Sequence, residues 1–261
     1  MGRFDKKLAT VDGLKKKLDS IRPLNKGILD RLREDFMIGN TYNSNAIEGN
    51  TLTERETMIV IKEGVTISGK SMREHMEAVG HMDALEFVAS LADKKEPLTE
   101  WQIRQIHSLV LIDDAKNKGV YRPVPVTIRG ASHQPPEPYL IAPQMEALMA
   151  EYENIKKEKH IIEAVAEFHL RFEGIHPFID GNGRTGRLII NLEMMKAGYL
   201  PVDIKFADRD KYYKCFDSFF GPDESSDLLT EMIVGYETEE LERYLKIVEY
   251  ASGAQGKREN F

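Results

Sequence analysis

Most of the chain spaces its hydrophobic residues as amphipathic helices do. Apolar side chains recur every three or four positions in two separate stretches, at Leu98, Ile103, Ile106 and Val110, and again at Ile162, Val165, Phe168 and Phe172. Clusters of glycine and proline separate such stretches, as expected where helices end. The pattern therefore predicts an all-α fold of roughly nine helices, with no doubly wound sheet.

One segment, residues 124–141, departs from the helical pattern. It reads VPVTIRGASHQPPEPYLI and alternates β-branched with small residues about Gly130 before it reaches Pro135 and Pro136. Proline lacks the amide hydrogen that an inner strand needs, so it is confined to edge strands and turns. The pattern predicts a short β-hairpin at the edge of the fold. The polar tail, residues 253–261, is expected to fray.

The composition is that of a globular protein with a charged surface. The 261 residues include 36 Lys and Arg against 43 Asp and Glu, a net charge of −7, which argues against extended binding to nucleic acid. No apolar run approaches the roughly 20 residues of a membrane span, and the charged N-terminus is unlike a secretory signal. We expect a cytoplasmic protein without nucleic-acid or membrane partners, and a buried structural thiol at Cys215.

Residues Gly64–Ser71, GVTISGKS, match the phosphate-binding expression G-x-x-x-x-G-K-[ST]. The run Leu109–Asp114, LVLIDD, imitates the acidic strand that a P-loop NTPase also requires. The mechanism demands a buried strand directly before the loop, but Lys62 and Glu63 interrupt the apolar approach to it. LVLIDD also continues a helical stripe, so a P-loop NTPase is a remote alternative.

A second glycine-rich stretch, His176–Arg187, reads HPFIDGNGRTGR between two helical patterns. Its Gly181-Asn182-Gly183 run can adopt positive φ angles, so that successive amides converge on an anion. The helix that follows directs its N-terminal amides and dipole to the same point. Arg184 and Arg187 are three residues apart and lie on one face of the first turn. This arrangement predicts a polyphosphate site.

Two further side chains flank this loop. Asp180 is a hard oxygen ligand suited to Mg²⁺, and the His176 imidazole is suited to proton abstraction near neutral pH. An ordinary turn between helices would explain the glycines alone. It would not require two arginines in register together with a histidine and an aspartate.

The segment HPFIDGNGRTGR resembles the signature of the Fic family, H-x-F-x-[DE]-G-N-G-R-x-x-R, at every position. The resemblance implies the all-helical Fic (Fido) fold with a short hairpin flap. It also implies a protein adenylyltransferase, which transfers AMP from ATP to a hydroxyl of a target protein.

The family's residue roles transfer to matching positions. His176 is the implied general base, Phe178 packs inward, and Asp180 is the implied Mg²⁺ ligand. Tyr212, in the segment DRDKYY, is implied to contact the nucleotide, although Phe220 replaces an asparagine common in the family and puts strict adenine selection in doubt. The implied ATP-binding residues are Gly181, Asn182, Gly183, Arg184, Thr185, Gly186, Arg187 and Tyr212.

The upstream segment SNAIEG, Ser44 to Gly49, looks like the family's inhibitory motif [ST]-x-x-x-E-[GN]. Its position resembles the subclass with an N-terminal inhibitory helix. A Glu48 carboxylate paired with Arg187 would occupy the guanidinium that the γ-phosphate needs. The resemblance therefore implies an enzyme held off by Ser44 and Glu48.

The segment GVYRPVPVTIRGASHQPP looks like the family's flap, which holds a target segment by strand addition. Val126, Thr127 and Ile128 are the implied target-binding residues. The implied organisation is one compact unit of N-terminal helices with the inhibitory motif (1–95), a Fic core (96–220), and C-terminal helices with a frayed tail (221–261).

The leading hypothesis is therefore an autoinhibited protein adenylyltransferase that uses ATP and Mg²⁺. Its implied partner is a protein bearing a Tyr, Thr or Ser hydroxyl, which could be the chain itself, and self-association is compatible with the sequence. Two alternatives stay open. The same site could remove AMP from a modified protein, with Glu48 assisting a water, or it could be a nucleotide-sensing module without enzymatic activity.

Overall fold

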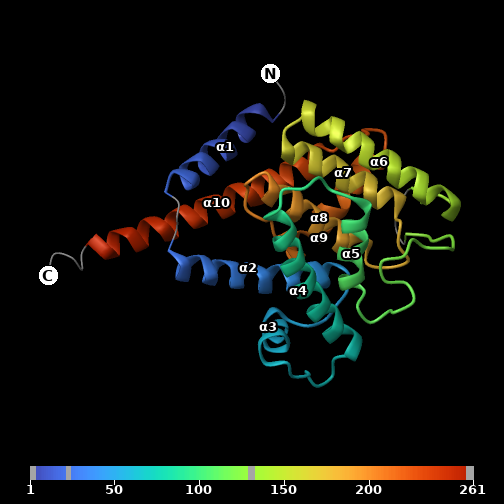
Figure 1. The fold of residues 1–261 in the computed structure, drawn as a ribbon, viewed down its shortest axis with the longest axis horizontal. Helices are drawn as coiled ribbons and strands as arrows, with labels where there is room; N and C mark the ends of the chain where they lie inside the picture. The colour runs from blue at the N-terminus through green and yellow to red at the C-terminus, as the bar shows by residue number, and fades with distance from the viewer. Residues whose placement is uncertain (1–3, 22–24, 129–132, 257–261) are drawn as a thin grey trace.

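The computed structural model describes residues 4–21, 25–128 and 133–256, and the described residues form ten α-helices, one 3₁₀ helix and no β-strand. This confirms the predicted all-α class (Figure 1). The elements are α1 (Asp5–Ser20), α2 (Lys26–Ile47), α3 (Glu54–Glu63), α4 (Met72–Ala92), α5 (Glu100–Val110), α6 (Pro138–Glu158), α7 (Ile161–Ile175), α8 (Asn182–Lys196), η1 (Phe206–Asp208), α9 (Arg209–Phe220) and α10 (Asp227–Gly256).

Helices α3, α4 and α5 each begin with a capping box. Thr53, Ser71 and Thr99 each accept a hydrogen bond from the amide three residues later, whose Glu or Gln side chain bonds back to the cap amide. Such a capping box satisfies amides that the first helical turn leaves free. The boundaries of α3, α4 and α5 therefore follow directly from short sequence motifs.

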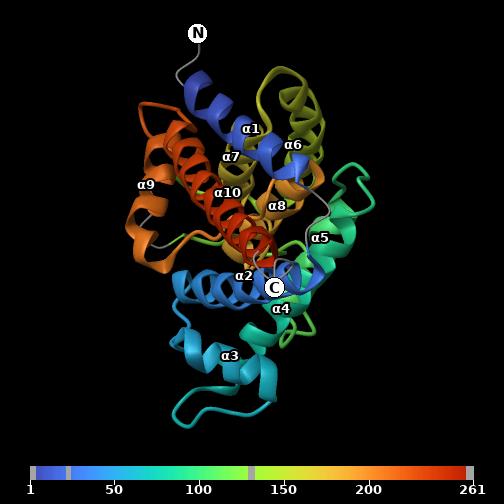
Figure 2. The same ribbon diagram turned by 90° about the vertical axis from the view of Figure 1, so that its left-hand side faces the viewer.

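Helices α7 and α8 form the centre of the molecule. Helix α7 packs against α6, α8, α9 and α10, while α8 packs against α2, α4 and α5. The long α10 lies along α1 (Figure 2). One buried apolar cluster runs from Leu8 in α1 to Leu245 in α10, and a small separate cluster joins α3 to α4. The turn between α7 and α8 is thus supported on most sides.

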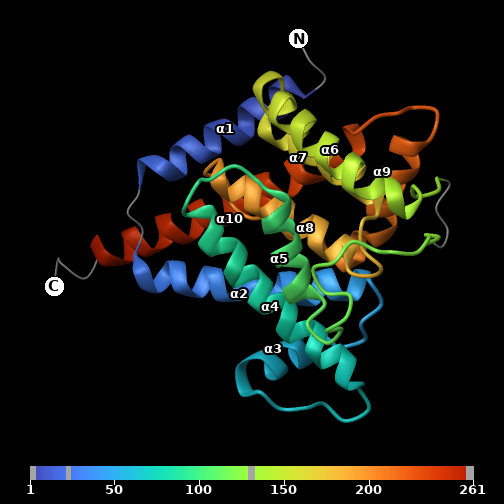
Figure 3. The ribbon, with the colours of Figure 1, turned by 45° about the vertical axis from the view of Figure 1, so that its right-hand side comes forward.

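The hairpin predicted at residues 124–141 is not shown. Its described residues 124–128 and 133–137 contain no strand (Figure 3), and 129–132 lie outside the described residues. Prolines at positions 123, 125, 135 and 136 remove amide donors that a ladder would need. The buried Arg122 side chain joins the two segments instead, donating to the carbonyl oxygens of Val124 at 2.9 Å and Pro136 at 2.6 Å.

The P-loop alternative lacks its supporting structure. Helix α3 precedes Gly64–Ser71 where a strand would be required, and Gly64 ends that helix in a left-handed conformation. The Lys70 ammonium donates to the Thr51 carbonyl oxygen and lies 3.8 Å from Glu56. Lys70 is therefore engaged in joining the loop to the start of α3.

Two smaller predictions can be compared with the structure. Cys215 is buried and its burial raises the pKa of the thiol to about 12, which confirms a structural thiol. Within the described residues, none of the helices has both the length and the apolar content to cross a membrane.

Candidate active site

The signature residues form the turn between α7 and α8. Helix α7 ends at Ile175, and His176 adopts a left-handed conformation with φ 49° and ψ 59°. Gly181, with φ 76°, then precedes the first residue of α8, Asn182. Positive φ is uncommon for a residue with a side chain, so the surrounding structure must hold His176 in place. The free amides at the start of α8 create a setting that favours an anion.

The Asn182 side chain holds this turn closed. Its Oδ1 accepts from the Phe178 amide and its Nδ2 donates to the Phe178 carbonyl, both at 2.9 Å. Phe178 is fully buried and stacks on His107 with ring centroids 3.6 Å apart, so it packs inward as predicted. Because Asn182 uses both polar side-chain atoms here, its main-chain amide is the group left for a phosphate.

Arg187 meets the end of α2. Its Nη2 donates to Glu48 Oε1 and to the Ser44 carbonyl, each at 2.8 Å, and its Nε donates to Ser44 Oγ at 3.0 Å. The Arg187 side chain is 5% exposed and that of Glu48 is 35% exposed, so solvent screens this ion pair less than a surface pair. The structure thus brings together the three residues of the implied inhibitory contact.

The Glu48 carboxylate also lies against Gly183 in the first turn of α8. A Cβ atom placed on Gly183 would overlap Glu48 Oε1 and would lie 3.1 Å from Arg187 Nη1. Glycine at this position is therefore required for the carboxylate to approach the helix backbone so closely. The side chain occupies the space next to the anion-binding amides.

We predict that Gly183→Ala destabilises the protein through Glu48. Overpacking of this kind costs about 1–3 kcal/mol, and most of that cost should disappear when Glu48→Gly is also present. The measurement is urea unfolding of both single variants and the double variant, with Gly235→Ala as the control. No atom lies within 4 Å of the Cβ position of Gly235, so this variant should be as stable as wild type or slightly more stable. An equal loss with and without Glu48 would contradict the predicted contact.

Arg184 points into the protein between α4 and the loop. Its side chain is 1% exposed, and its guanidinium lies 3.5 Å from Glu77 and 3.5 Å from Asp180, with Asn45 Oδ1 at 3.4 Å. Two carboxylates therefore compensate this buried charge. Thr185 and Gly186, also implied to bind ATP, are buried and do not line the cavity described below.

Asp180 stands at the rim of the site with its side chain 44% exposed. Its Oδ2 accepts from Arg73 at 2.5 Å, and its Oδ1 accepts from the Gly181 amide at 2.6 Å. Among the described residues, no group of three or more His, Cys, Asp or Glu side chains gathers as a metal site. One carboxylate suits a Mg²⁺ ion that keeps most of its waters and takes other ligands from phosphates.

Tyr212 supports Arg187 from the side opposite Glu48. Its hydroxyl accepts from Arg187 Nη1 at 3.3 Å and lies 2.7 Å from His169 Nε2, and Tyr212 is 1% exposed. Burial, together with the Arg187 charge, lowers the pKa of His169 to about 3, so this imidazole is neutral at neutral pH. The Tyr212 hydroxyl thus contacts Arg187, and Tyr212 also lines the cavity described next.

A cavity of about 390 Å³ lies in front of His176 and the start of α8. Tyr213, 38% exposed, and Arg209 contribute to its wall from α9, where the two side chains stack with the guanidinium carbon 5.0 Å from the ring centroid. Of the three implied target-binding residues, Ile128 lines the cavity, Val126 is half-buried and Thr127 is exposed.

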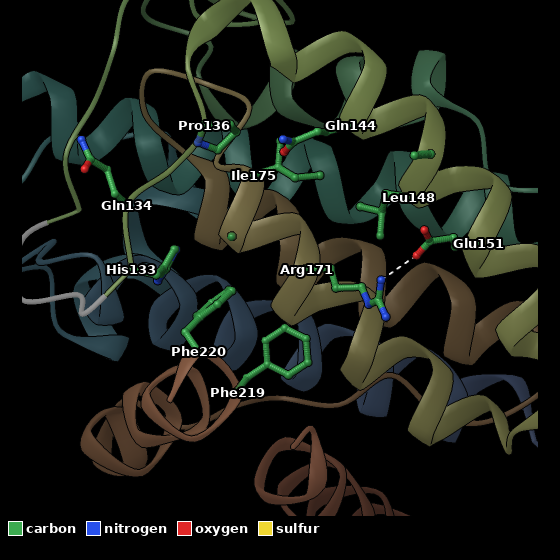
Figure 4. Close-up of a pocket in the computed structure, with 12 residues that line it drawn as sticks. His133, Gln134, Pro136, Gln144, Leu148, Glu151, Arg171, Ile175, Phe219 and Phe220 are labelled. Atoms are coloured by element: carbon green, nitrogen blue, oxygen red, sulfur yellow. Dashed lines mark hydrogen bonds and ion pairs between the residues drawn. The ribbon is translucent and has the colours of Figure 1, made fainter. Parts of the chain in front are cut away.

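A second cavity, of about 480 Å³, lies beside the first and shares His133 with it. Figure 4 shows it between α6, α7 and the end of α9. His133 stacks on Phe220 with ring centroids 3.7 Å apart, and Phe220 fits against α7 because a Cβ on Gly174 would lie 2.6 Å from its ring. Phe220, the position that departs from the family pattern, therefore lines the second cavity beside the shared His133.

Several neighbours of the site have no motif in the sequence. Arg73 and Glu77 come from α4, so only tertiary packing brings them to the loop. Tyr213 belongs to the segment DRDKYY, from which the sequence analysis named only Tyr212. Glu173 is different, because it precedes His176 by three residues at a helix end, and that spacing places two side chains together.

Comparison with known proteins agrees with this geometry. The model of the Fic/DOC family matches residues 97–194. The protein adenylyltransferase Fic of Nematostella vectensis is 38% identical over 213 residues, which are 79% of this chain and 48% of that protein. The chain therefore spans about half the length of the curated relatives it matches.

Two solved structures share the fold over nearly the whole chain. A Fic domain containing signaling protein from Bacteroides thetaiotaomicron superposes with a TM-score of 0.84 at 27% identity, covering 92% of this chain and 97% of that one. Fic-1 from C. elegans gives 0.83 at 27% identity, covering 94% and 73%. With the complete signature placed between α7 and α8, residues 97–194 are a Fic/DOC domain.

Proposed function

We propose that the chain is an autoinhibited protein adenylyltransferase, which transfers AMP from ATP to a hydroxyl side chain of a protein. Relatives named protein adenylyltransferase Fic support the reaction class. The ion pair between Glu48 and Arg187, at 2.8 Å over the start of α8, carries the proposal of autoinhibition. The proposed acceptor of AMP is a hydroxyl group of another protein or of the chain itself.

The phosphate groups of ATP bind at the start of α8 in this mechanism. Main-chain amides of Gly181–Gly183 and the helix dipole attract the α- and β-phosphates. Once the Glu48 side chain has moved away, Arg187 donates two N–H hydrogen bonds to the γ-phosphate, because a guanidinium can form paired hydrogen bonds with phosphate oxygens. Arg184 contributes its positive charge from behind the loop. Tyr212 and Tyr213 both line the cavity, and the more exposed Tyr213 is proposed to contact the base beside Tyr212.

The chemistry then takes place in front of His176. His176 removes the proton of the target hydroxyl, the resulting oxygen forms a bond to the α-phosphorus, and the bond from the α-phosphorus to the β-phosphate oxygen breaks. Pyrophosphate leaves, and the target retains AMP. Asp180, once released from Arg73, would hold Mg²⁺, which would neutralise part of the phosphate charge. The target segment is proposed to enter along Val126, Thr127 and Ile128, because Ile128 lines the cavity.

The proposal is tested by incubating the full chain with Mg²⁺ and ATP labelled on the α-phosphate, in a cell extract. Glu48→Gly protein should label a protein band, and mass spectrometry should find one AMP group on Tyr, Thr or Ser. When the ATP is labelled on the γ-phosphate instead, no label should appear on protein. Transfer of the γ-label would show a kinase-like reaction and would overturn the proposal.

Removal of AMP is a second candidate, since Glu48 lines the same cavity as His176 and its carboxylate could orient a water there. A target that already carries AMP separates the two reactions. Release of free AMP by wild type but not by Glu48→Gly would favour removal. Release by neither protein would leave transfer as the function of the site.

We predict that Lys70→Ala leaves ATP affinity unchanged. Lys70 is bonded to the Thr51 carbonyl and does not face the cavity at the start of α8. Titration calorimetry should be done in the Glu48→Gly background, where the proposed site is free. A large loss of ATP affinity in Lys70→Ala would instead indicate a phosphate site at Gly64–Ser71.

A further inference from the structure

Glu173, near the end of α7, is a buried carboxylate that the proposed mechanism does not use. The residue is 8% exposed, and its Oε1 has no hydrogen-bond partner among the described residues. On one side it is closed off by Gly186, where a Cβ atom would lie 3.1 Å from Oε1. A buried carboxylate that lacks donors is costly, so a nearby N–H should compensate it.

The His176 imidazole offers that donor. Its Nδ1 lies 3.5 Å from Glu173 Oε2, and Nδ1 is itself buried and has no hydrogen-bond partner in the described part of the chain. The left-handed turn at His176 directs the ring back toward the last turn of α7. The unsatisfied Nδ1 therefore faces an oxygen of the Glu173 carboxylate, and a small movement of either side chain would complete a hydrogen bond between them.

Two other polar groups lie nearby, and neither contacts the His176 ring. His169 lies one turn earlier on α7, with its Nε2 2.7 Å from the Tyr212 hydroxyl; its Nδ1 has no hydrogen-bond partner among the described residues and lies, like Glu173 Oε1, against Gly186. Arg122 approaches His176, but its Nε donates to the main-chain oxygen at 2.8 Å and not to the ring. Glu173 is thus the residue placed to set the state of the His176 ring.

We propose that Glu173 is the positioning residue of the catalytic base, which keeps the proton of neutral His176 on Nδ1. An ionised carboxylate can only accept a hydrogen bond, so the imidazole nitrogen that faces it must carry the hydrogen. With the hydrogen on Nδ1, the Nε2 lone pair is free to face the cavity. When Nε2 takes the proton of the target hydroxyl, the imidazolium forms beside the Glu173 negative charge and is stabilised by it. The inference rests on the proposed transfer reaction, in which His176 is the base.

The first test is nitrogen NMR of the full chain labelled with ¹⁵N-histidine, which needs no activity. The His176 signals are those lost in His176→Ala. Wild type should show the Nδ1–H tautomer, Glu173→Gln should largely keep it because its amide oxygen still accepts, and Glu173→Met should shift the population toward Nε2–H. Equal populations in wild type and Glu173→Met would overturn the proposal, whether or not the protein transfers AMP.

The second test is kinetic and uses the Glu48→Gly background. Glu173→Met should lower kcat on the order of 100-fold, with the KM for ATP nearly unchanged, and Glu173→Gln should recover at least about tenfold of that loss. The matched control is Glu167→Gln, because Glu167 is an equally buried carboxylate of α7 held by Lys159 and Arg171, each at 2.7 Å. It should change neither kcat nor the His176 tautomer. If Glu167→Gln lowered kcat as much as Glu173→Met does, Glu173 would have only a structural role.

Discussion

The Glu48→Gly substitution is expected to tighten ATP binding by about 100-fold or more, because it removes a negative charge from the space that the γ-phosphate must enter. Close, partly buried charge pairs have coupling energies of about 1.5–7 kcal/mol, and each 1.4 kcal/mol corresponds to about a tenfold change in affinity. In the resting protein Arg187 is bonded to Glu48, so ATP must first separate that pair. Isothermal titration of wild type, Glu48→Gly and Glu48→Gln with Mg²⁺-ATP measures the difference.

Glu63→Gly is a matched control for this experiment. Glu63 ends α3 directly before Gly64, a left-handed glycine, just as Glu48 follows α2 directly before Gly49. Both substitutions place glycine beside a helix end, but Glu63 is exposed and does not line the cavity. ATP affinity in Glu63→Gly should equal that of wild type. If Glu48→Gly also bound ATP with wild-type affinity, Glu48 would not act as an inhibitor.

The fold could be predicted well wherever the chain obeys local rules. The apolar spacing at Ile162, Phe168 and Phe172 correctly indicated the buried face of α7, since helical period and burial are linked directly. The predicted hairpin is not shown: the sequence analysis allowed Pro135 and Pro136 at an edge strand, but four prolines in and beside the two described segments remove amides that even an edge ladder needs. Arg122, which joins the two segments through its guanidinium, belongs to no pattern that a sequence displays.

In the site too, features set by neighbouring residues in the sequence could be predicted, and contacts between distant residues could not. The turn from His176 to Arg187 is contiguous, so its residue types and spacing were enough to predict a phosphate site. The partners of its charged groups are distant in sequence, as in the pairing of Arg73 with Asp180 across 107 positions. Such pairs depend on how α4 crosses α8, which no short motif specifies. The contact of Glu48 with Arg187 was foreseen only through the family resemblance.

The largest loss is expected from His176→Ala, made in the Glu48→Gly background so that transfer can be measured. Removing a general base typically costs about 10²–10⁴-fold in rate, and the cost should fall on kcat. ATP binding should persist, because the α8 amides and Arg187 contact the phosphates without His176. Single-turnover transfer of labelled AMP and calorimetry on the same protein separate the two effects.

His133→Ala is the control, since His133 also lines the cavity but its ring stacks on Phe220. It should alter the KM for the target far more than the rate of the chemical step. Undiminished single-turnover transfer by His176→Ala would show that another group or solvent removes the target's proton. A loss confined to ATP affinity would also contradict a role in proton transfer, because removing a general base should slow the chemical step and leave ATP binding intact.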